Sequence, residues 1–153
     1  MALGLIPATG DWDYRQFNTN SAATFTKGCL VALNGARNVI EHTSTLSHYL
    51  GIAMQNSANS TPPGKVMVAI PKPGCTATAD CFTGMAQSDM SIGQARGIAK
   101  LGNFYSYVTT LHTSVFSQIF TIVGPVDSTY SRVEVAFIQN EAMLYSTSSV
   151  SIV

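Results

Sequence analysis

Histidine, cysteine and acidic side chains are the groups in this sequence that could carry out catalysis or hold a metal ion. The histidines are His42, His48 and His112, and no His-x-x-x-His or Glu-x-x-His spacing joins them to a second ligand. Glu41 precedes His42, but adjacent residues of a strand point to opposite faces, so the two do not form a dyad by themselves. We therefore expect exposed or turn histidines, no metal, no cofactor and no enzymatic activity.

The three cysteines, Cys29, Cys75 and Cys81, form no recognisable metal or disulfide framework. Their odd number argues against a secreted disulfide scaffold. Cys75 and Cys81 could pair, but the residues between them match no established zinc spacing. We interpret all three as buried or half-buried thiols, and the pairing of Cys75 with Cys81 stays open.

The composition is unusually poor in ions. Only 10% of the 153 residues are charged, where soluble domains carry about 25%, and the net charge is zero. The basic residues are scattered, so a nucleic-acid partner is not expected. No apolar run reaches the length of a membrane span, and the first residues lack the features of a signal peptide or of a myristoylation site. An uncharged polar surface favours contact with several protein partners, because few ions must be desolvated.

Short β-rich runs separated by turn residues dominate the chain. The clearest is "SRVEVAFI", in which Val133, Val135 and Phe137 alternate with polar residues. Asn34-Gly35 predicts a hairpin, and the stretch from 111 to 124 predicts a short helix or turn leading into a strand. No segment has the length and period of a long helix. The pattern predicts an all-β fold, either a small β-barrel or a sandwich of short strands.

One strand pattern occurs twice. "GKVMVAI" (Gly64–Ile70) and "SRVEVAF" (Ser131–Phe137) match at an offset of 67 residues, with valines at the same places. Gly28 and Gly93 would each lead a strand, and Gly51 and Gly124 would each lie in a middle apolar run. These matches suggest two similar halves that pair in one body, although chance similarity between Val-rich strands remains an alternative.

Both ends of the chain are interpreted as extended arms around a β-barrel body at residues 25–140. The N-terminal arm would span residues 1–24 and the C-terminal arm residues 141–153. Both contain large apolar side chains that a disordered tail would lack. We expect these to contact a neighbouring subunit, although they could equally cover the protein's own body. The expected interface residues are Leu5, Ile6, Trp12, Tyr14, Phe17, Leu144 and Tyr145.

Four elements of the sequence resemble the head decoration, or capsid cement, proteins of tailed bacteriophages. They are the Gly-led strand at Gly28–Val31, the segment Leu50–Ala53, the strand at Gly64–Val68 and the closing "RVEVAFI". The resemblance covers about residues 25–80 and 120–138. The segment Phe120–Val126 departs from the pattern, because its glycine comes late, and the N-terminal arm is longer and more aromatic.

The resemblance implies a homotrimeric β-barrel protein on the outer surface of an icosahedral virion, assembled in the host cytoplasm. Its partners would be the major capsid protein and copies of itself, and it would brace the shell against internal DNA pressure. A second hypothesis is a trimeric fibre or tail module that binds a host glycan. That module would need an exposed aromatic platform, for which Tyr105 and Tyr107 are the best candidates.

Overall fold

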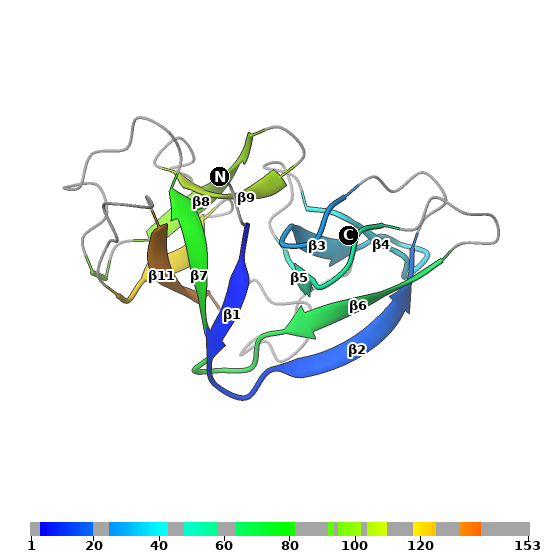
Figure 1. Ribbon diagram of the computed structural model, residues 1–153, viewed down its shortest axis with the longest axis horizontal. Helices are drawn as coiled ribbons and strands as arrows, with labels where there is room; N and C mark the ends of the chain where they lie inside the picture. Colours follow the sequence, from blue (N-terminus) through cyan, green and yellow to red (C-terminus); the bar gives the residue numbers. More distant parts are fainter. Residues whose placement is uncertain are drawn as a thin grey trace.

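In the part of the chain that the structure describes, the regular elements are all β-strands, joined by turns and loops (Figure 1). The structure is a computed structural model. It describes the residues 4–19, 25–42, 48–57, 64–81, 92–93, 95–101, 104–109, 118–124 and 132–138. Figure 1 shows two groups of strands side by side along the long axis. The predicted all-β fold class is confirmed. The helix or turn expected before residue 118 and the C-terminal arm lie outside the described residues.

Within these ranges, one sheet contains six strands, in the order β1-β7-β11-β10-β8-β9. Its neighbouring strands are antiparallel. The end of β7 also pairs in parallel with β9, so that β7, β11, β10, β8 and β9 form a closed order. The bounds are β1 (Ile6–Thr9), β7 (Thr76–Cys81), β8 (Ala95–Leu101), β9 (Phe104–Thr109), β10 (Gln118–Ile122) and β11 (Arg132–Phe137).

The other described sheet contains five strands, in the order β2-β6-β5-β3-β4, and its neighbours are also antiparallel. A parallel bridge between Thr19 and Val39 connects the end of β2 to β4. In this sheet, too, the last strand in the order, β4, therefore contacts the first strand, β2. The bounds are β2 (Asp13–Asn18), β3 (Leu30–Leu33), β4 (Val39–Glu41), β5 (Gly51–Ala53) and β6 (Lys65–Ile70).

The two sheets repeat one arrangement of strands. We call β2 to β6 the first unit and β7 to β11 the second unit. In each unit the spatial order is first, fifth, fourth, second and third strand. β6 and β11 occupy the same place and lie 67 residues apart in sequence. The pairs Val31↔Glu41 and Ile98↔Val108 have the same register at that offset. The prediction of two similar halves is confirmed.

A glycine at the start of each unit's second strand has the same role in both copies. Gly28 and Gly93 both have a φ of 92°, which few residues with side chains adopt. The Gly28 N–H donates to Ala53 O at 2.8 Å, and the Gly93 N–H donates to Ile122 O at 2.7 Å. The predicted middle apolar runs correspond to the equivalent strands β5 and β10, but Gly51 lies within β5 whereas Gly124 follows β10. A Cβ on Gly51 would lie 2.2 Å from Ala69 O, so close strand packing requires this glycine.

The predicted Asn34-Gly35 hairpin is present, but its turn differs from the expected one. The residue with positive φ in this loop is Arg37, at 63°. Asn34 organises the loop, because its Oδ1 accepts the N–H groups of Ala36 and Asn38, both at 3.0 Å. The Asn34 side chain therefore adds to the backbone hydrogen bonds that close the loop, from Asn34 N–H to Asn38 O and from Arg37 N–H to Asn34 O.

The apolar core has two parts. The first lies inside the first unit and contains Val66, Val68 and Ile70, each fully buried. The second contains the equivalent Val133, Val135 and Phe137 of the second unit, together with residues from the outward face of the first unit: Leu30, Tyr49, Ile52 and Ala69. The second part of the core therefore joins the two units.

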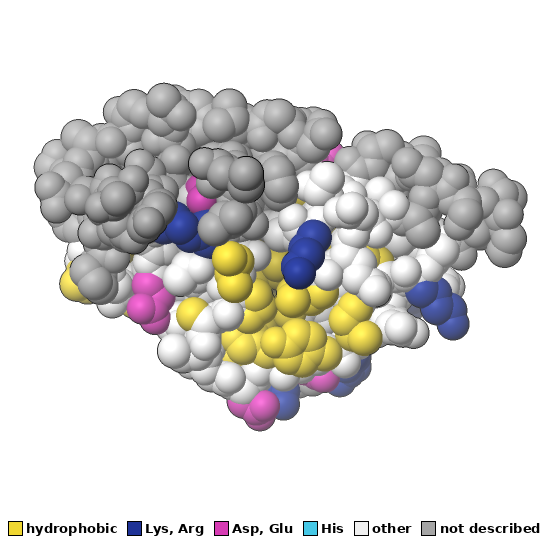
Figure 2. Space-filling view, in the orientation of Figure 1, with side chains coloured by type: hydrophobic (Ala, Val, Ile, Leu, Met, Phe, Trp, Pro, Cys, Tyr) yellow, Lys and Arg dark blue, Asp and Glu magenta, His cyan; other side chains and the backbone are white. Residues whose placement is uncertain are grey.

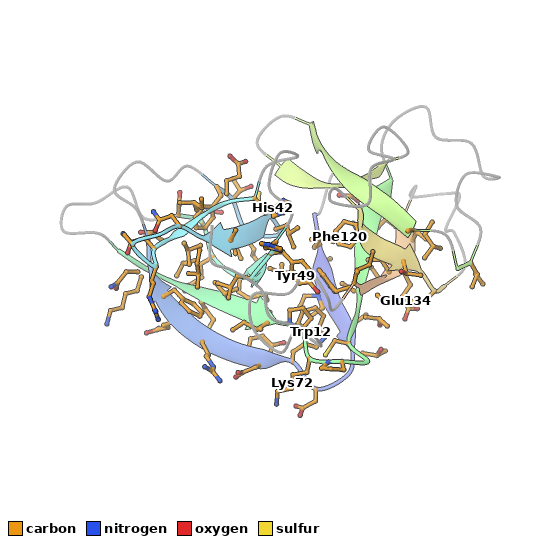
Figure 3. The ribbon with its side chains drawn as sticks, turned by 180° about the vertical axis from the view of Figure 1, so that it is seen from behind. Trp12, His42, Tyr49, Lys72, Phe120 and Glu134 are labelled. Carbon is orange, nitrogen blue, oxygen red and sulfur yellow. The ribbon has the colours of Figure 1, made fainter. Side chains whose placement is uncertain are left out.

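Aromatic side chains concentrate where the units meet (Figure 3). The ring of Phe137 lies 5.2 Å from Tyr49, 5.4 Å from Phe120 and 5.7 Å from Trp12, measured between centroids. The Tyr49 hydroxyl donates to Ile138 O at 3.1 Å. These contacts connect β11 to a segment of the first unit and to the N-terminal region.

Residues 4–19 of the predicted N-terminal arm are extended and pair with strands of the protein's own body. Its first strand, β1, pairs with β7, and its second strand, β2, pairs with β6 along Asp13–Asn18. Of the two alternatives for the predicted arm at residues 1–24, the described part therefore packs on the protein's own body. Backbone hydrogen bonds along two strands place the segment at an edge of each sheet.

We predict that Ile70→Ala lowers the free energy of unfolding by about 2–5 kcal/mol and Phe137→Ala by about 3–5 kcal/mol. Both side chains fill the interior of their unit at equivalent positions. Urea denaturation would measure the change. Ile92→Ala is the control, because Ile92 is 70% exposed and its loss should change stability by less than about 0.5 kcal/mol. A cost below about 1 kcal/mol at either core position would contradict the shared interior role.

Candidate interaction surface

A buried ion pair fixes the N-terminal segment to the second unit. Asp80 of β7 and Arg132 of β11 are cross-strand neighbours and form a salt bridge, with side chains 7% and 12% exposed. Arg132 Nη2 also donates to Thr78 Oγ1 at 2.8 Å and to the carbonyl of Gly4 at 3.0 Å. The Gly4 N–H in turn donates to Asp80 Oδ2 at 2.8 Å. The Asp80–Arg132 ion pair thus binds both the N–H and the C=O of Gly4.

Gly4 also brings the N-terminal segment against the first unit. Gly4 has a φ of +70°, and a Cβ there would lie 2.9 Å from Gly28 O, so a side chain would not fit. The next N–H, of Leu5, donates to Gly28 O at 2.9 Å. The segment before β1 therefore contacts both units and sets the distance between β1 and the first unit.

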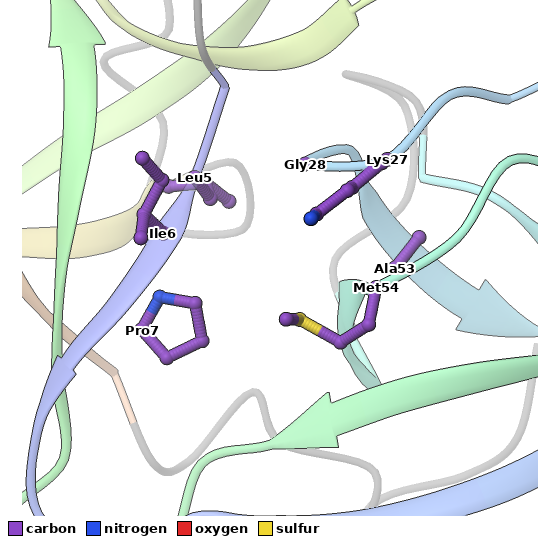
Figure 4. A pocket seen from close by; sticks show the side chains of 7 residues that line it. All are labelled: Leu5, Ile6, Pro7, Lys27, Gly28, Ala53 and Met54. Atoms are coloured by element: carbon purple, nitrogen blue, oxygen red, sulfur yellow. The ribbon is translucent and has the colours of Figure 1, made fainter.

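A pocket of about 360 Å³ lies between β1 and the first unit (Figure 4). Leu5, Ile6 and Pro7 form one wall, and Lys27, Gly28, Ala53 and Met54 form the other. Figure 4 shows Met54 facing Pro7 and the Lys27 side chain reaching toward Leu5 and Ile6. The lining is apolar apart from the Lys27 ammonium and the backbone. Such a site favours an apolar group whose polar end is negative.

The position of Lys27 is set by a turn rather than by its charge. Its N–H donates to Asn56 Oδ1 at 2.9 Å, and Gly28 follows with positive φ. No carboxylate among the described residues forms an ion pair with its ammonium group. Arg15, Lys72 and Arg132 do have such partners, namely Asp13, Asp11 and Asp80.

The expected interface residues divide into buried and exposed groups. Leu5 is 2% exposed and belongs to the core, and it also lines the pocket. Trp12 is half-buried against Phe137, and Phe17 is half-buried against the core of the first unit. Ile6 and Tyr14 are 42% and 52% exposed and remain available for a partner. Leu144 and Tyr145 lie outside the described residues.

The histidine, cysteine and acidic side chains are the possible metal ligands in the described part of the chain. No cluster of three or more His, Cys, Asp or Glu side chains capable of holding a metal is found there. His42 is buried, contrary to the expectation of exposed or turn histidines, because it directly follows β4 and its N–H donates to Leu30 O at 3.0 Å. His48 is half-buried, and His112 lies outside the described residues.

Cys29 and Cys75 are buried and take part in no disulfide, as expected, so Cys75 and Cys81 are not paired. Burial raises the pKa of the Cys75 thiol. A hydrogen bond between the thiol and the backbone of Lys72 lowers the pKa of Cys75, whereas the negative charge of Asp11 raises it further. Cys75 is therefore a packed side chain with low reactivity rather than a nucleophile.

No known protein family matches this chain, and the search of curated proteins found no similar sequence. The described residues contain no helix that is long and apolar enough to cross a membrane. The surface must therefore be interpreted from its own geometry.

Sequence patterns did not identify the pocket or the ion pair. Lys27 and Met54 look ordinary in their own segments, and Asp80 and Arg132 are 52 residues apart. The one available signal was the strand repeat, because it predicted that Arg132 would begin a strand equivalent to β6.

We predict that Arg132→Met lowers the free energy of unfolding by about 3–5 kcal/mol, because it leaves the Asp80 carboxylate buried without its partner. The double variant Asp80→Asn/Arg132→Met should recover part of this loss, as measured by urea denaturation. Arg15→Met is the matched control. Arg15 is 53% exposed in its ion pair with Asp13, and its loss should cost less than about 1 kcal/mol. Equal losses of stability in Arg132→Met and Arg15→Met would contradict a special stabilising role of the buried Asp80–Arg132 ion pair.

We also predict that iodoacetamide alkylates Cys75 in the native protein at least about tenfold more slowly than in urea. The rate should rise from pH 7 to pH 9 without a plateau. The reason is that a raised pKa leaves the thiolate a minor species through this range. Peptide mass spectrometry assigns the modified cysteine. A native rate equal to the unfolded one would contradict the burial of this thiol.

Proposed function

We propose that the protein is a structural, non-catalytic virion component that binds the outer surface of a phage capsid and cements neighbouring capsid subunits. Its partners in this role are the major capsid protein and other copies of itself, arranged as a homotrimer. It acts on the outer surface of the virion after assembly in the host cytoplasm. The resemblance of four sequence elements to capsid decoration proteins motivates the proposal.

The observation that carries the proposal is the joining of two equivalent β units in one body. A protein that braces a shell must transmit tension between at least two attachment points. The second part of the core and the Asp80–Arg132 ion pair connect the units through packed side chains rather than through a linker. A shell presents identical subunits side by side, and a chain with two similar units offers related surfaces to adjacent copies.

The distribution of exposed apolar side chains supports the same role. Ile6 and Tyr14 belong to the N-terminal strands, whereas Ile92 and Val123 belong to the second unit, at 70% and 39% exposure. Contacts at several separate places suit a protein that touches more than one neighbour. The low proportion of charged residues keeps the desolvation cost of such contacts small.

The direct test is co-sedimentation of the purified chain with empty, expanded head shells of the phage that encodes it. We expect the protein to bind the shells and to raise the temperature at which they rupture. Light scattering should give the mass of a trimer. Failure of the unmodified chain to bind these shells would reject the proposed function, and adsorption to host cells instead would favour the glycan-binding hypothesis.

Single substitutions can locate the contact without removing a strand. Deleting residues 1–20 would remove β1 and β2 and disturb both sheets. We predict that Tyr14→Ser weakens shell binding by roughly five- to thirtyfold, because an exposed tyrosine is a frequent anchor of interfaces. Gly35→Ala is the control, because a Cβ at this exposed turn residue meets nothing within 4 Å. Equal binding by the two variants would remove Tyr14 from the interface.

A further inference from the structure

The pocket between β1 and the first unit has the size of a side-chain site. Its volume of about 360 Å³ corresponds to roughly twelve water molecules at their liquid volume of about 30 Å³. One or two large side chains would fill it. Ile6, Pro7 and Met54 give it an apolar lining, which favours aliphatic or aromatic groups over sugars or nucleotides.

The charge at this pocket selects the sign of its occupant. Lys27 is exposed and lines the pocket, while no carboxylate in the described ranges forms an ion pair with it. An incoming carboxylate would complete there the kind of pair that three other basic residues, Arg15, Lys72 and Arg132, already make within the chain. A cationic occupant would be repelled.

The backbone of β1 is poorly suited to accept an additional strand. The Leu5 N–H is already used by Gly28 O, and Pro7 has no N–H to donate. An extended peptide would therefore find few main-chain donors on this edge. Recognition at this place must come from an inserted side chain.

The surroundings of the pocket indicate a macromolecular partner. Figure 2 shows hydrophobic side chains gathered on this face, with a basic side chain beside them. Ile6 lines the pocket and is also 42% exposed, so the apolar lining continues onto the outer surface. A small molecule would fill the pocket and leave this surrounding surface uncovered, whereas a protein segment would cover both.

We propose that the pocket receives a large apolar side chain of a capsid subunit, with an Asp or Glu next to it in sequence that pairs with Lys27. The inference rests on the proposed function and names the chemistry of its contact. The apolar side chain is the anchor, and the ion pair at the mouth orients it.

The first experiment tests the chemistry of the pocket without a capsid. The full-length, ¹⁵N-labelled protein is titrated with sodium hexanoate, 1-hexanol and hexylammonium chloride, and the amides of Leu5, Lys27 and Met54 are followed by NMR. We expect hexanoate to bind about three- to tenfold more tightly than hexylammonium. Lys27→Glu should reverse this preference, and Ile6→Ser should weaken all three probes. Lys65→Glu, which changes an exposed lysine of β6, should have no effect.

Shifts spread over the surface, or equal affinity for the three probes, would overturn the inference. The second experiment measures shell binding by the same variants. We expect Lys27→Glu and Ile6→Ser each to lower affinity at least about fivefold, while Lys65→Glu binds like the unmodified chain. Normal binding by both pocket variants would overturn the inference and leave the proposed function intact. Absence of binding by the unmodified chain would instead reject the proposed function.

Discussion

The ion pair between Asp80 and Arg132 determines how the two units and the N-terminal segment fit together. It is formed across two neighbouring strands, and it holds the N–H and the C=O of Gly4, a residue 76 positions from Asp80 and 128 from Arg132. Since either charge alone would be costly in this buried place, the contact forms as a whole or not at all. Once Gly4 is fixed, Leu5 reaches Gly28, β1 aligns on β7, and the walls of the pocket are placed.

The two units are related in strand order but differ in their surroundings. In the first unit the outward face of β6 is covered at Ala69, which is fully buried in the cluster that contains residues of both units. The equivalent Ala136 of β11 is only half-buried. The contact between units is therefore not symmetric, because the outer side of the first packs on the interior side chains of the second. The resulting apolar cluster contains side chains of both units, which favours their cooperative folding.

Local patterns predicted the features that depend on local geometry. Alternation identified Val133, Val135 and Phe137 as an interior face, and the positive φ of Gly28 and Gly93 explains why both units begin with glycine. The sequence did not decide between the two alternatives for the N-terminal segment, because pairing along a strand uses backbone groups that every residue type possesses. The burial of Leu5 and His42 likewise depends on segments distant in sequence, and so does the meeting of Lys27 with Ile6 and Met54.

The way each strand order returns to its first member has a consequence for a protein made in many copies. An open sheet edge is a template on which identical chains can add without limit. In the first unit β4, the last strand in spatial order, contacts the end of β2 through Thr19↔Val39. In the second unit β9 contacts β7 through Asp80↔Tyr107, and the edge of β1 contains a proline. Fibrous growth through main-chain pairing is thereby restricted at these edges. Assembly is left to side chains, which can restrict the number of neighbours and stop at a defined particle.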